Sequence, residues 1–446
     1  MADNHVVIRS PQLPRLQQIS LLFAAVMLIV FRSPELFLMP RFWAEEGTYF
    51  FSFAYTHRWF ETLLHAVPHL GYYSLIHNIA ALCATFAPLE FAPIVTMAFG
   101  CLSYLVPCWI VIIGNSKFWD SVSKKLLICT GILLFSFGRN WLTTTYIHFN
   151  LALILFFILL ENMDQHPKHI RYFFRSIIAI SGLSGAVACF LVPAFIVKAW
   201  RSRNREDIFQ AGLIIAASII QIFVVIYLFT TLPETRLARQ ANFGYEPLWS
   251  IILFQFGIPV YGDYIFFGSE LVAFLNAKLF YSYVLPGYNV LGNSILLFKD
   301  TFSFGLIFPV ITYVMYLSYR YVIKERLLLP VISFWLVFLL SSLGSVKMMG
   351  GSRYAYVPTV ILFVLFVAEL HSQHRTRKII AALIITLMLI ANGYAYRKSI
   401  EIYSPRWSEE VASWKHNHSY RLKIWPYNGS NDVWEVALTK PRPQGN

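Results

Sequence analysis

This chain has 446 residues, of which 57% are hydrophobic, 17% aromatic and only 13% charged. An ordinary soluble domain carries roughly 25% charged residues, so the composition excludes a water-soluble globular protein. The formal charge of +13 would suit a nucleic-acid-binding protein, but the Lys and Arg residues stand in short clusters between apolar runs and form no single basic face. We therefore expect no nucleic-acid partner.

Apolar runs of membrane-spanning length recur from Ile19 to Ala395. Because hydrocarbon leaves backbone polar groups unsatisfied, only helices and closed barrels cross it, and long runs without alternation predict helices. We expect an all-α polytopic membrane protein, a bundle of about eleven transmembrane helices. The apolar segments are Ile19–Phe31, Tyr72–Ala87, Ala92–Gly114, Leu126–Gly138, Phe149–Leu160, Ile177–Val197, Gly212–Thr231, Phe304–Tyr319, Leu328–Gly344, Tyr354–Leu370 and Ile379–Ala395.

Two topologies fit these segments, and the positive-inside rule separates them. If Tyr72–Ala87 and Ile177–Val197 are each one crossing, the basic clusters at 117–125 and 168–175 both fall outside. If Tyr72–Ala87 is instead a juxtamembrane or re-entrant piece and Gly182–Gly185 turns two half-helices around, every cluster lies inside. Both topologies start inside and end outside, and the rule favours the second.

The expected organisation is a transmembrane domain over residues 1–398 and a short external tail over 399–446. The domain has a first outer loop at 32–90 and a large outer loop at 232–303. In the tail, two short period-2 runs flank Asn428-Gly429 and predict a hairpin. A tail of this size cannot hold its own core, so we expect it to dock on the outer membrane face.

Two adjacent carboxylates, Glu45 and Glu46, follow the first helix in an aromatic setting, with Trp43 before them and Tyr49 after them. A carboxylate beside a membrane can act as a general base for a hydroxyl, or bind a metal or a sugar hydroxyl. The simpler interpretation is a pair of solvated loop acids anchored by Trp43.

Basic residues also occur on the expected outer side, where topology statistics disfavour them. Arg353 and Lys347 stand at the start of the tenth crossing. Arg can bind the phosphate of a lipid-linked substrate through two parallel N–H donors, and Lys can bind it as a point charge. Arg236 and Arg239 in the large outer loop raise the same question, and for all four the alternative is anchoring to lipid headgroups.

Polar residues of two outer segments are weaker candidates. The first outer loop contains four histidines, and His65 and His69 have an i, i+4 spacing found in some metal sites, although Pro68 between them opposes a regular helix. The polar turn from Asn140 to Asn150 could hydrogen-bond sugar hydroxyls, while helix capping explains its Thr and Asn residues equally well. The four histidines are His57, His65, His69 and His77.

The stretch Phe42–Gly47 resembles bacterial polytopic GT-C-type glycosyltransferases, including the membrane glucosyltransferases that modify O-antigen in serotype conversion. Further landmarks of that group follow in the same order and cover roughly residues 40 to 360. The superfamily opens its first outer loop with an Asp-Glu-x-x-Tyr-like motif, which Glu45–Tyr49 matches with Glu in place of Asp. A related pattern, Trp-Ala-Glu-Asp-Gly, has Asp where this chain has Glu46, which leaves open which carboxylate acts. The other landmarks are Gly71-Tyr72-Tyr73, Pro88–Pro93, Gly182–Gly185 with Pro193, and Gly351–Tyr354 with Pro358.

The resemblance implies an enzyme of the bacterial inner membrane, with a cytoplasmic N-terminus and a periplasmic C-terminus. It implies transfer of a sugar from a polyprenyl-phosphate donor to a cell-envelope glycan of the O-antigen or lipopolysaccharide type. Glu45 would be the base, and Arg353, with Lys347, would stabilise the leaving lipid phosphate. No cofactor is required, and a divalent metal is compatible with this chemistry but not indicated. The expected substrate contacts are Trp43, Tyr49, Asn140, Trp141, His148 and Tyr354.

Two other classes remain open at this point. An O-antigen polymerase, a ligase or a glycan acyltransferase shares the outer-face setting. A transporter of lipid-linked glycans would need charged residues inside several helices and repeat symmetry, and the sequence has neither.

Overall fold

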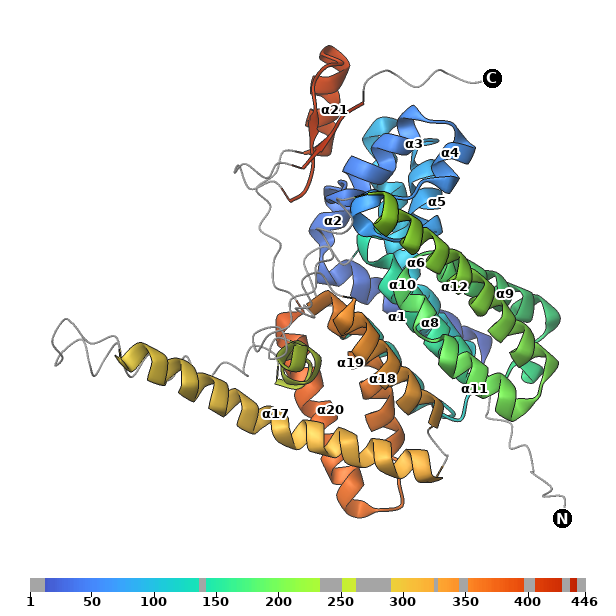
Figure 1. Ribbon diagram of the computed structural model, residues 1–446, viewed down its shortest axis with the longest axis vertical. Coiled ribbons are helices and arrows are strands. Elements are labelled where there is room, and N and C mark those ends of the chain that lie inside the picture. Colours follow the sequence, from blue (N-terminus) through green and yellow to red (C-terminus); the bar gives the residue numbers. More distant parts are fainter. Residues whose placement is uncertain are drawn as a thin grey trace.

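The computed structural model describes residues 13–135, 142–232, 251–261, 290–324, 328–344, 352–396, 406–426 and 434–438. These residues are almost entirely helical, as the sequence predicts (Figure 1). Most of the longer helices form one bundle, from which one end of α17 (Val290–Lys324) projects, and a set of short elements lies together with the C-terminal tail at one end of the bundle.

The first helix, α1 (Arg15–Arg32), leads into the first outer loop, which is a chain of short elements. Prolines begin two of these elements, α2 and η2, because proline supplies the helical φ and needs no N–H bond at a first turn. Gly71 ends one of them with a φ of 68°. The elements are α2 (Pro34–Leu38), η1 (Glu46–Phe51), α3 (Ser52–Thr56), α4 (Trp59–Leu64), η2 (Pro68–Leu70), α5 (Leu75–Ala84) and η3 (Leu89–Phe91).

Two helices form the centre of the bundle, α8 (Ile147–Leu160) and α19 (Ser352–Glu369), and they pack against each other. Every residue of α8 except His148 is buried, which explains why this helix is apolar on all sides. In α19, Arg353 and Tyr354 at the start are half-buried, and residues 355–367 are buried. The N-terminal ends of the two central helices lie side by side, where Phe149 of α8 meets Tyr354 of α19.

The other helices surround this pair. The helices α6 (Ala92–Ile113) and α18 (Leu328–Leu343) both contact α8, and α20 (Arg375–Ala395) contacts α19. The remaining elements are α7 (Val122–Leu134), η4 (Thr144–Tyr146), η5 (Met163–Gln165), α9 (Lys168–Gly182), α10 (Ala186–Cys189), α11 (Val192–Ser202), α12 (Arg205–Thr231), η6 (Leu253–Gly257), α15 (Ile258–Tyr261) and α17 (Val290–Lys324).

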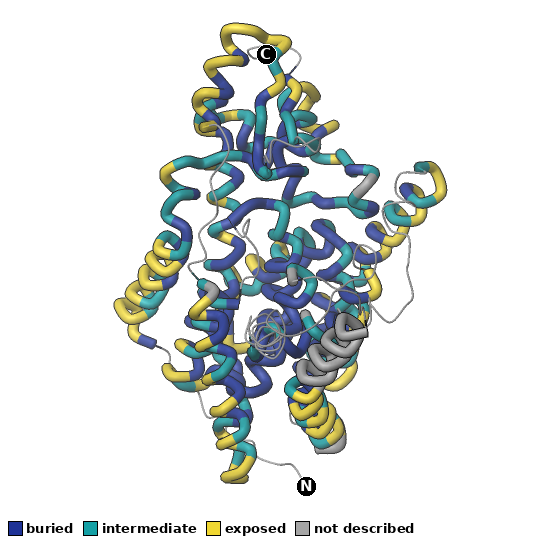
Figure 2. Tube along the Cα trace, turned by 90° about the vertical axis from the view of Figure 1, so that its left-hand side faces the viewer, coloured by how far each residue is buried: buried dark blue, intermediate teal, exposed yellow. Residues whose placement is uncertain are grey.

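Large apolar side chains cover the outer sides of several helices, where Figure 2 shows exposed residues. A soluble monomer seldom exposes so much continuous apolar surface, so these faces are suited to lipid. On α12 the exposed side chains are Ile208, Phe209, Ile219, Ile220, Ile222, Phe223, Ile226 and Tyr227. On α1 they are Leu16, Ile19, Phe23, Val26, Met27, Leu28 and Phe31.

Four described helices are long and apolar enough to cross a membrane, and five if the bent pair of α9 with α10 and α11 counts as one span. This is fewer than the about eleven expected from sequence. Helix length accounts for part of the difference, since α7, α8 and α18 have 13, 14 and 16 residues. Such helices rise only about 20–24 Å, less than the ~30 Å of a hydrocarbon core.

Two features of the structure are compatible with the topology that the charge pattern favours. The segment expected at Tyr72–Ala87 forms α5, whose ten residues reach only about 15 Å. The long run around Gly182–Gly185 is broken there, and the helices on its two sides meet at a bend of 116°. Gly185 adopts a φ of 131°, which an L-residue rarely takes.

The C-terminal tail packs on the first outer loop. It contains α21 (Trp407–His416) and a hairpin in which β1 (Leu422–Lys423) pairs antiparallel with β2 (Glu435–Val436). This agrees with the predicted hairpin, although Asn428 and Gly429 lie outside the described residues. The two parts share one apolar core, made of Phe42, Phe51, Ala84, Leu89, Ala92, Trp407, Val411, Trp414, Leu422, Ile424, Val436 and Leu438.

Candidate functional site

The segment before the two acids is held by the tail. Trp425 donates its backbone N–H to the carbonyl of Phe42 and accepts the N–H of Ala44 at its own carbonyl. Ala44 has a φ of 41°, which is uncommon for a residue with a side chain. This left-handed residue sets the direction of the chain just before Glu45, and a residue from the far end of the sequence fixes it.

Glu46 is a supporting residue inside the protein. It is only 2% exposed, and its Oε1 accepts the backbone N–H and the hydroxyl of Thr144 at 2.9 and 2.8 Å. Its Oε2 accepts the N–H of Trp43 at 3.1 Å. Burial raises the pKa of Glu46, and the hydrogen bonds oppose this effect. The carboxylate therefore ties the first outer loop to the start of η4.

Glu45 differs from its neighbour. It is half-buried, and it lies close enough to Arg353 to interact with that guanidinium electrostatically. The tyrosines Tyr72, Tyr146 and Tyr354 interact with Arg353 as well. The fold thus brings together the carboxylate of Glu45 and the guanidinium of Arg353, which were singled out from distant parts of the sequence.

Aromatic rings surround this pair at the N-terminal ends of α8 and α19. The ring of Phe149 meets Tyr354 edge-on with 5.4 Å between centroids. His148 lies 5.7 Å from Tyr72 and 6.1 Å from His77, again between ring centroids. Aromatic side chains of this kind can pack against a sugar or a prenyl chain while they keep bulk water away.

Among the other predicted residues, Trp43 and Tyr49 face the tail. The ring centroid of Trp43 is 5.7 Å from that of Trp425, and Tyr49 meets Trp434 edge-on at 6.2 Å. Their role as substrate contacts stays a prediction. Lys347, Arg236, Arg239, Asn140 and Trp141 lie outside the described residues.

Three histidines of the first outer loop, His57, His65 and His77, pack as aromatic rings. Phe53 stacks between His57 and His65 with centroid distances of 3.8 and 3.7 Å, and His77 stacks on Phe50 at 4.7 Å. Burial lowers the pKa of His65 and of His77 to about 4. Within the described parts of the chain, no three His, Cys, Asp or Glu residues come together as a group that could hold a metal ion.

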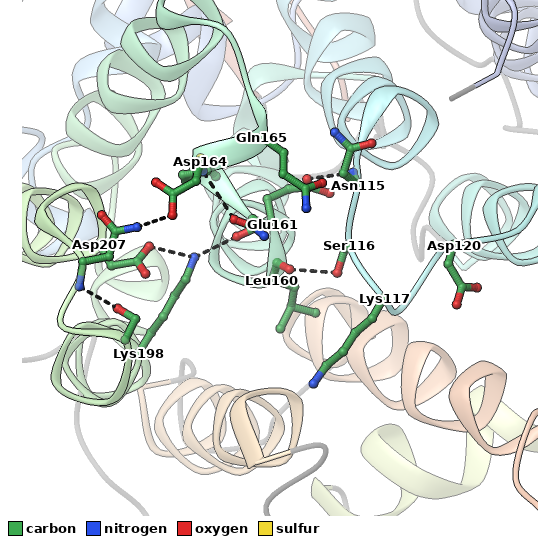
Figure 3. Close-up of a pocket in the computed structure, with 14 residues that line it drawn as sticks. Asn115, Ser116, Lys117, Asp120, Leu160, Glu161, Asp164, Gln165, Lys198 and Asp207 are labelled. Atoms are coloured by element: carbon green, nitrogen blue, oxygen red, sulfur yellow. Dashed lines mark hydrogen bonds and ion pairs between the residues drawn. The ribbon is translucent and has the colours of Figure 1, made fainter. Parts of the chain in front are cut away.

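A second polar region was not predicted. A cavity of about 750 Å³ lies among the loops at the C-terminal ends of α6, α8 and α11 (Figure 3). The Oε2 atom of Glu161 accepts the N–H of Asn115 at 3.0 Å and contacts Nε2 of His166 at 2.8 Å. Lys198 donates to the Glu161 carbonyl at 2.9 Å and pairs with Asp207 at 3.1 Å. This network ties these loops together at the ends of α6 and α8 that lie away from Glu45.

Sequence reasoning missed three residues that the structure places at or beside the site: Thr144, Arg41 and Trp425. Thr144 belongs to the polar turn that was singled out, but nothing in the pattern connected it to Glu46. Arg41 directly precedes the Phe42–Gly47 motif, where it resembles a basic membrane flank. Trp425 stands in a tail without a strong pattern, so only the fold connects it with Ala44.

The chain was also compared with known proteins. No protein-family model, curated protein or solved structure matches it.

Proposed function

We propose that this protein is a membrane glycosyltransferase that transfers a sugar from a polyprenyl-phosphate donor to a cell-surface glycan. In this proposal the chain crosses the bacterial inner membrane about eleven times. The short helices α7, α8 and α18 cross as members of the bundle, and the bend at Gly182–Gly185 joins two short crossings. The acceptor is a glycan of the O-antigen or lipopolysaccharide type on the outer face.

The observation that carries the proposal is that Glu45 lies close enough to Arg353 for the two charges to interact. Glu46 is buried and has all its hydrogen bonds inside the protein, so Glu45 is the acid that remains for chemistry. Arg353 forms no ion pair with a carboxylate in the described parts of the chain. It lies at the N-terminal end of α19, where the helix dipole favours an anion.

The residues account for an inverting displacement. The acceptor hydroxyl oxygen forms a bond to the anomeric carbon while the carboxylate of Glu45 takes the hydroxyl proton. The bond from that carbon to the phosphate oxygen breaks, and its electron pair leaves with the lipid phosphate. Arg353 stabilises the charge on this leaving group, an effect that is strongest in a site from which water is excluded.

The test is sugar transfer by purified full-length protein, with polyprenyl-phosphate sugars as donors and cell-envelope glycan as acceptor. Glu45→Gln keeps the size of the side chain but removes the base, so the rate should fall by roughly 10²–10⁴-fold. Glu46→Gln should lose less. Arg353→Ala should be inactive, and Arg353→Lys should recover only part of the rate because a point charge cannot replace a bidentate fork.

The matched control is Glu61→Gln, which changes an exposed acid of the same outer loop and should leave the rate unchanged. All variants are compared at equal amounts of protein in the membrane. An active Glu45→Gln beside an inactive Glu46→Gln would move the base by one residue. Full activity in both Glu variants would reject the proposed mechanism.

A further inference from the structure

Arg41 is a cation of the first outer loop that the proposed mechanism does not use. Its Cζ lies 4.3 Å from the ring centroid of Trp425, so the guanidinium lies over the indole face. Its Nη2 is buried and has no hydrogen-bond partner among the described residues. The tail therefore covers one face of the guanidinium and leaves an N–H edge unsatisfied.

Other cations that are largely buried have groups that accept their hydrogen bonds or pair with their charge. Lys198 pairs with Asp207, Arg377 with Glu369, and Lys125 donates to the carbonyls of Ile112 and Gly114. For Arg41 the structure gives no such pair within the described ranges. Burial alone lowers its pKa to about 10, and no carboxylate offsets this effect. A partly desolvated charge without a counter-ion is costly, and such charges concentrate at sites that receive a ligand of opposite charge.

We propose that Arg41 and Trp425 form an anion-binding site for the phosphate group of a membrane lipid, built jointly by the first outer loop and the C-terminal tail. Phosphate fits because a guanidinium presents parallel N–H donors that match two phosphate oxygens. Trp425 holds the guanidinium plane by a cation–π contact, so the free edge is fixed in direction.

The location agrees with a lipid ligand. Arg41 follows α1 and α2, at the level where the chain leaves the membrane-facing helix. It precedes Glu45 by one short segment that Trp425 itself holds. A phosphate bound at Arg41 would therefore lie near Glu45 in the chain. The inference rests on the proposed function for one point, the identity of the lipid as a polyprenyl phosphate.

Binding can be measured apart from sugar transfer. The full-length protein in a phosphate-free detergent is titrated with a polyprenyl phosphate, with the uncharged polyprenol and with phosphatidylglycerol, and bound lipid is counted by native mass spectrometry. The titrations use the wild type and Arg353→Ala, which removes the expected contact with the phosphate of the sugar donor. In the Arg353→Ala background, Arg41→Gln should weaken binding of polyprenyl phosphate by about 10- to 100-fold, the loss expected for a charge-assisted hydrogen bond.

Arg41→Lys should restore part of the affinity for polyprenyl phosphate. The affinity of Trp425→Phe should lie between those of the wild type and Arg41→Gln. The matched control is Arg421→Gln, since Arg421 is an exposed arginine of the same tail whose contact with Glu435 is 3.7 Å. It should bind like wild type. Equal binding of phosphatidylglycerol would assign the site to bulk anionic lipid, while binding of polyprenol as strong as that of the phosphate would overturn the inference.

Thermal stability separates a ligand site from a structural contact. Removal of a charge without a counter-ion relieves its desolvation, so Arg41→Gln should melt at or above the wild-type temperature without lipid. A clear fall in melting temperature with unchanged lipid binding would make Arg41 a structural residue. Unchanged lipid binding in Arg41→Gln, beside an inactive Glu45→Gln, would reject this site and leave the proposed function intact.

Discussion

At the scale of single residues, the most informative contrast is between two neighbours of the same type. Glu45 and Glu46 are adjacent in sequence, yet one is half-buried near Arg353 and the other is buried under Thr144. Ala44 turns the chain through a left-handed conformation immediately before them. The environment of each acid thus depends on residues far away in sequence, which is why the pattern alone left the choice open.

His77 gives a prediction of pH dependence at this scale. Burial lowers its folded-state pKa from 6.5 to about 4, so between these values the unfolded chain binds a proton that the folded protein does not. Stability is therefore fully present above pH 6.5 and falls as the pH drops toward 4, by roughly 3 kcal/mol from this residue. Thermal melts of detergent-solubilised protein from pH 7.5 to 4.5 should show this loss.

The variants make the assignment specific. His77→Asn should reduce the pH dependence and leave the part that comes from His65, whose pKa burial also lowers to about 4. His169→Gln, which changes an exposed histidine, should leave the pH dependence as in the wild type. An identical slope in wild type and His77→Asn would mean that His77 is not the group that titrates.

At the scale of elements, the sequence was most informative where a physical rule constrains a whole segment. The positive-inside rule predicted that the run containing Gly182–Gly185 turns back, and the structure bends there by 116°. Apolar length predicted helices but not all of their ends, since the apolar run Leu126–Gly138 corresponds to α7, which begins at Val122 and ends at Leu134. Contacts between distant segments, such as Trp425 with Phe42 and Ala44, leave no local pattern and could not be predicted.

The bend leads to a prediction for Gly185. A Cβ added there would lie 3.0 Å from Cβ of His148, and the backbone has a φ of 131° that disfavours any side chain. Gly185→Ala should therefore lower stability by about 1–3 kcal/mol, and it should reduce sugar transfer because His148 borders the site. Melting temperature and transfer rate at equal protein level check both effects.

The control is Gly212→Ala in α12, where an added Cβ meets nothing within 4 Å. It should be neutral or slightly stabilising, because Ala favours helix more than Gly does. Equal stability of Gly185→Ala and Gly212→Ala would show that the bend relaxes without strain.

At the scale of the whole molecule, the bundle has two ends, and each end is held by its own set of contacts. The outer end holds the first outer loop, the tail and the site, and these share an apolar core of their own. At the other end, Lys198 donates to the carbonyl of Glu161, and Arg175 pairs with Glu206. These contacts bring the first half of α9 and the end of α11 close to the segments that precede and follow them.

This arrangement yields a prediction of topology. If the run from 177 to 197 crossed once, Arg175 would lie across the membrane from Glu206, and their ion pair could not form. The ten residues of α5 reach only about 15 Å and cannot cross ~30 Å of hydrocarbon. Reporters fused after Lys125 and after Arg175 should therefore read cytoplasmic, and one fused after Arg397 should read external. An external reading at both of the first two positions would make α5 a crossing, turn α9 to α11 into a single span and reject the bend as a turn between half-helices.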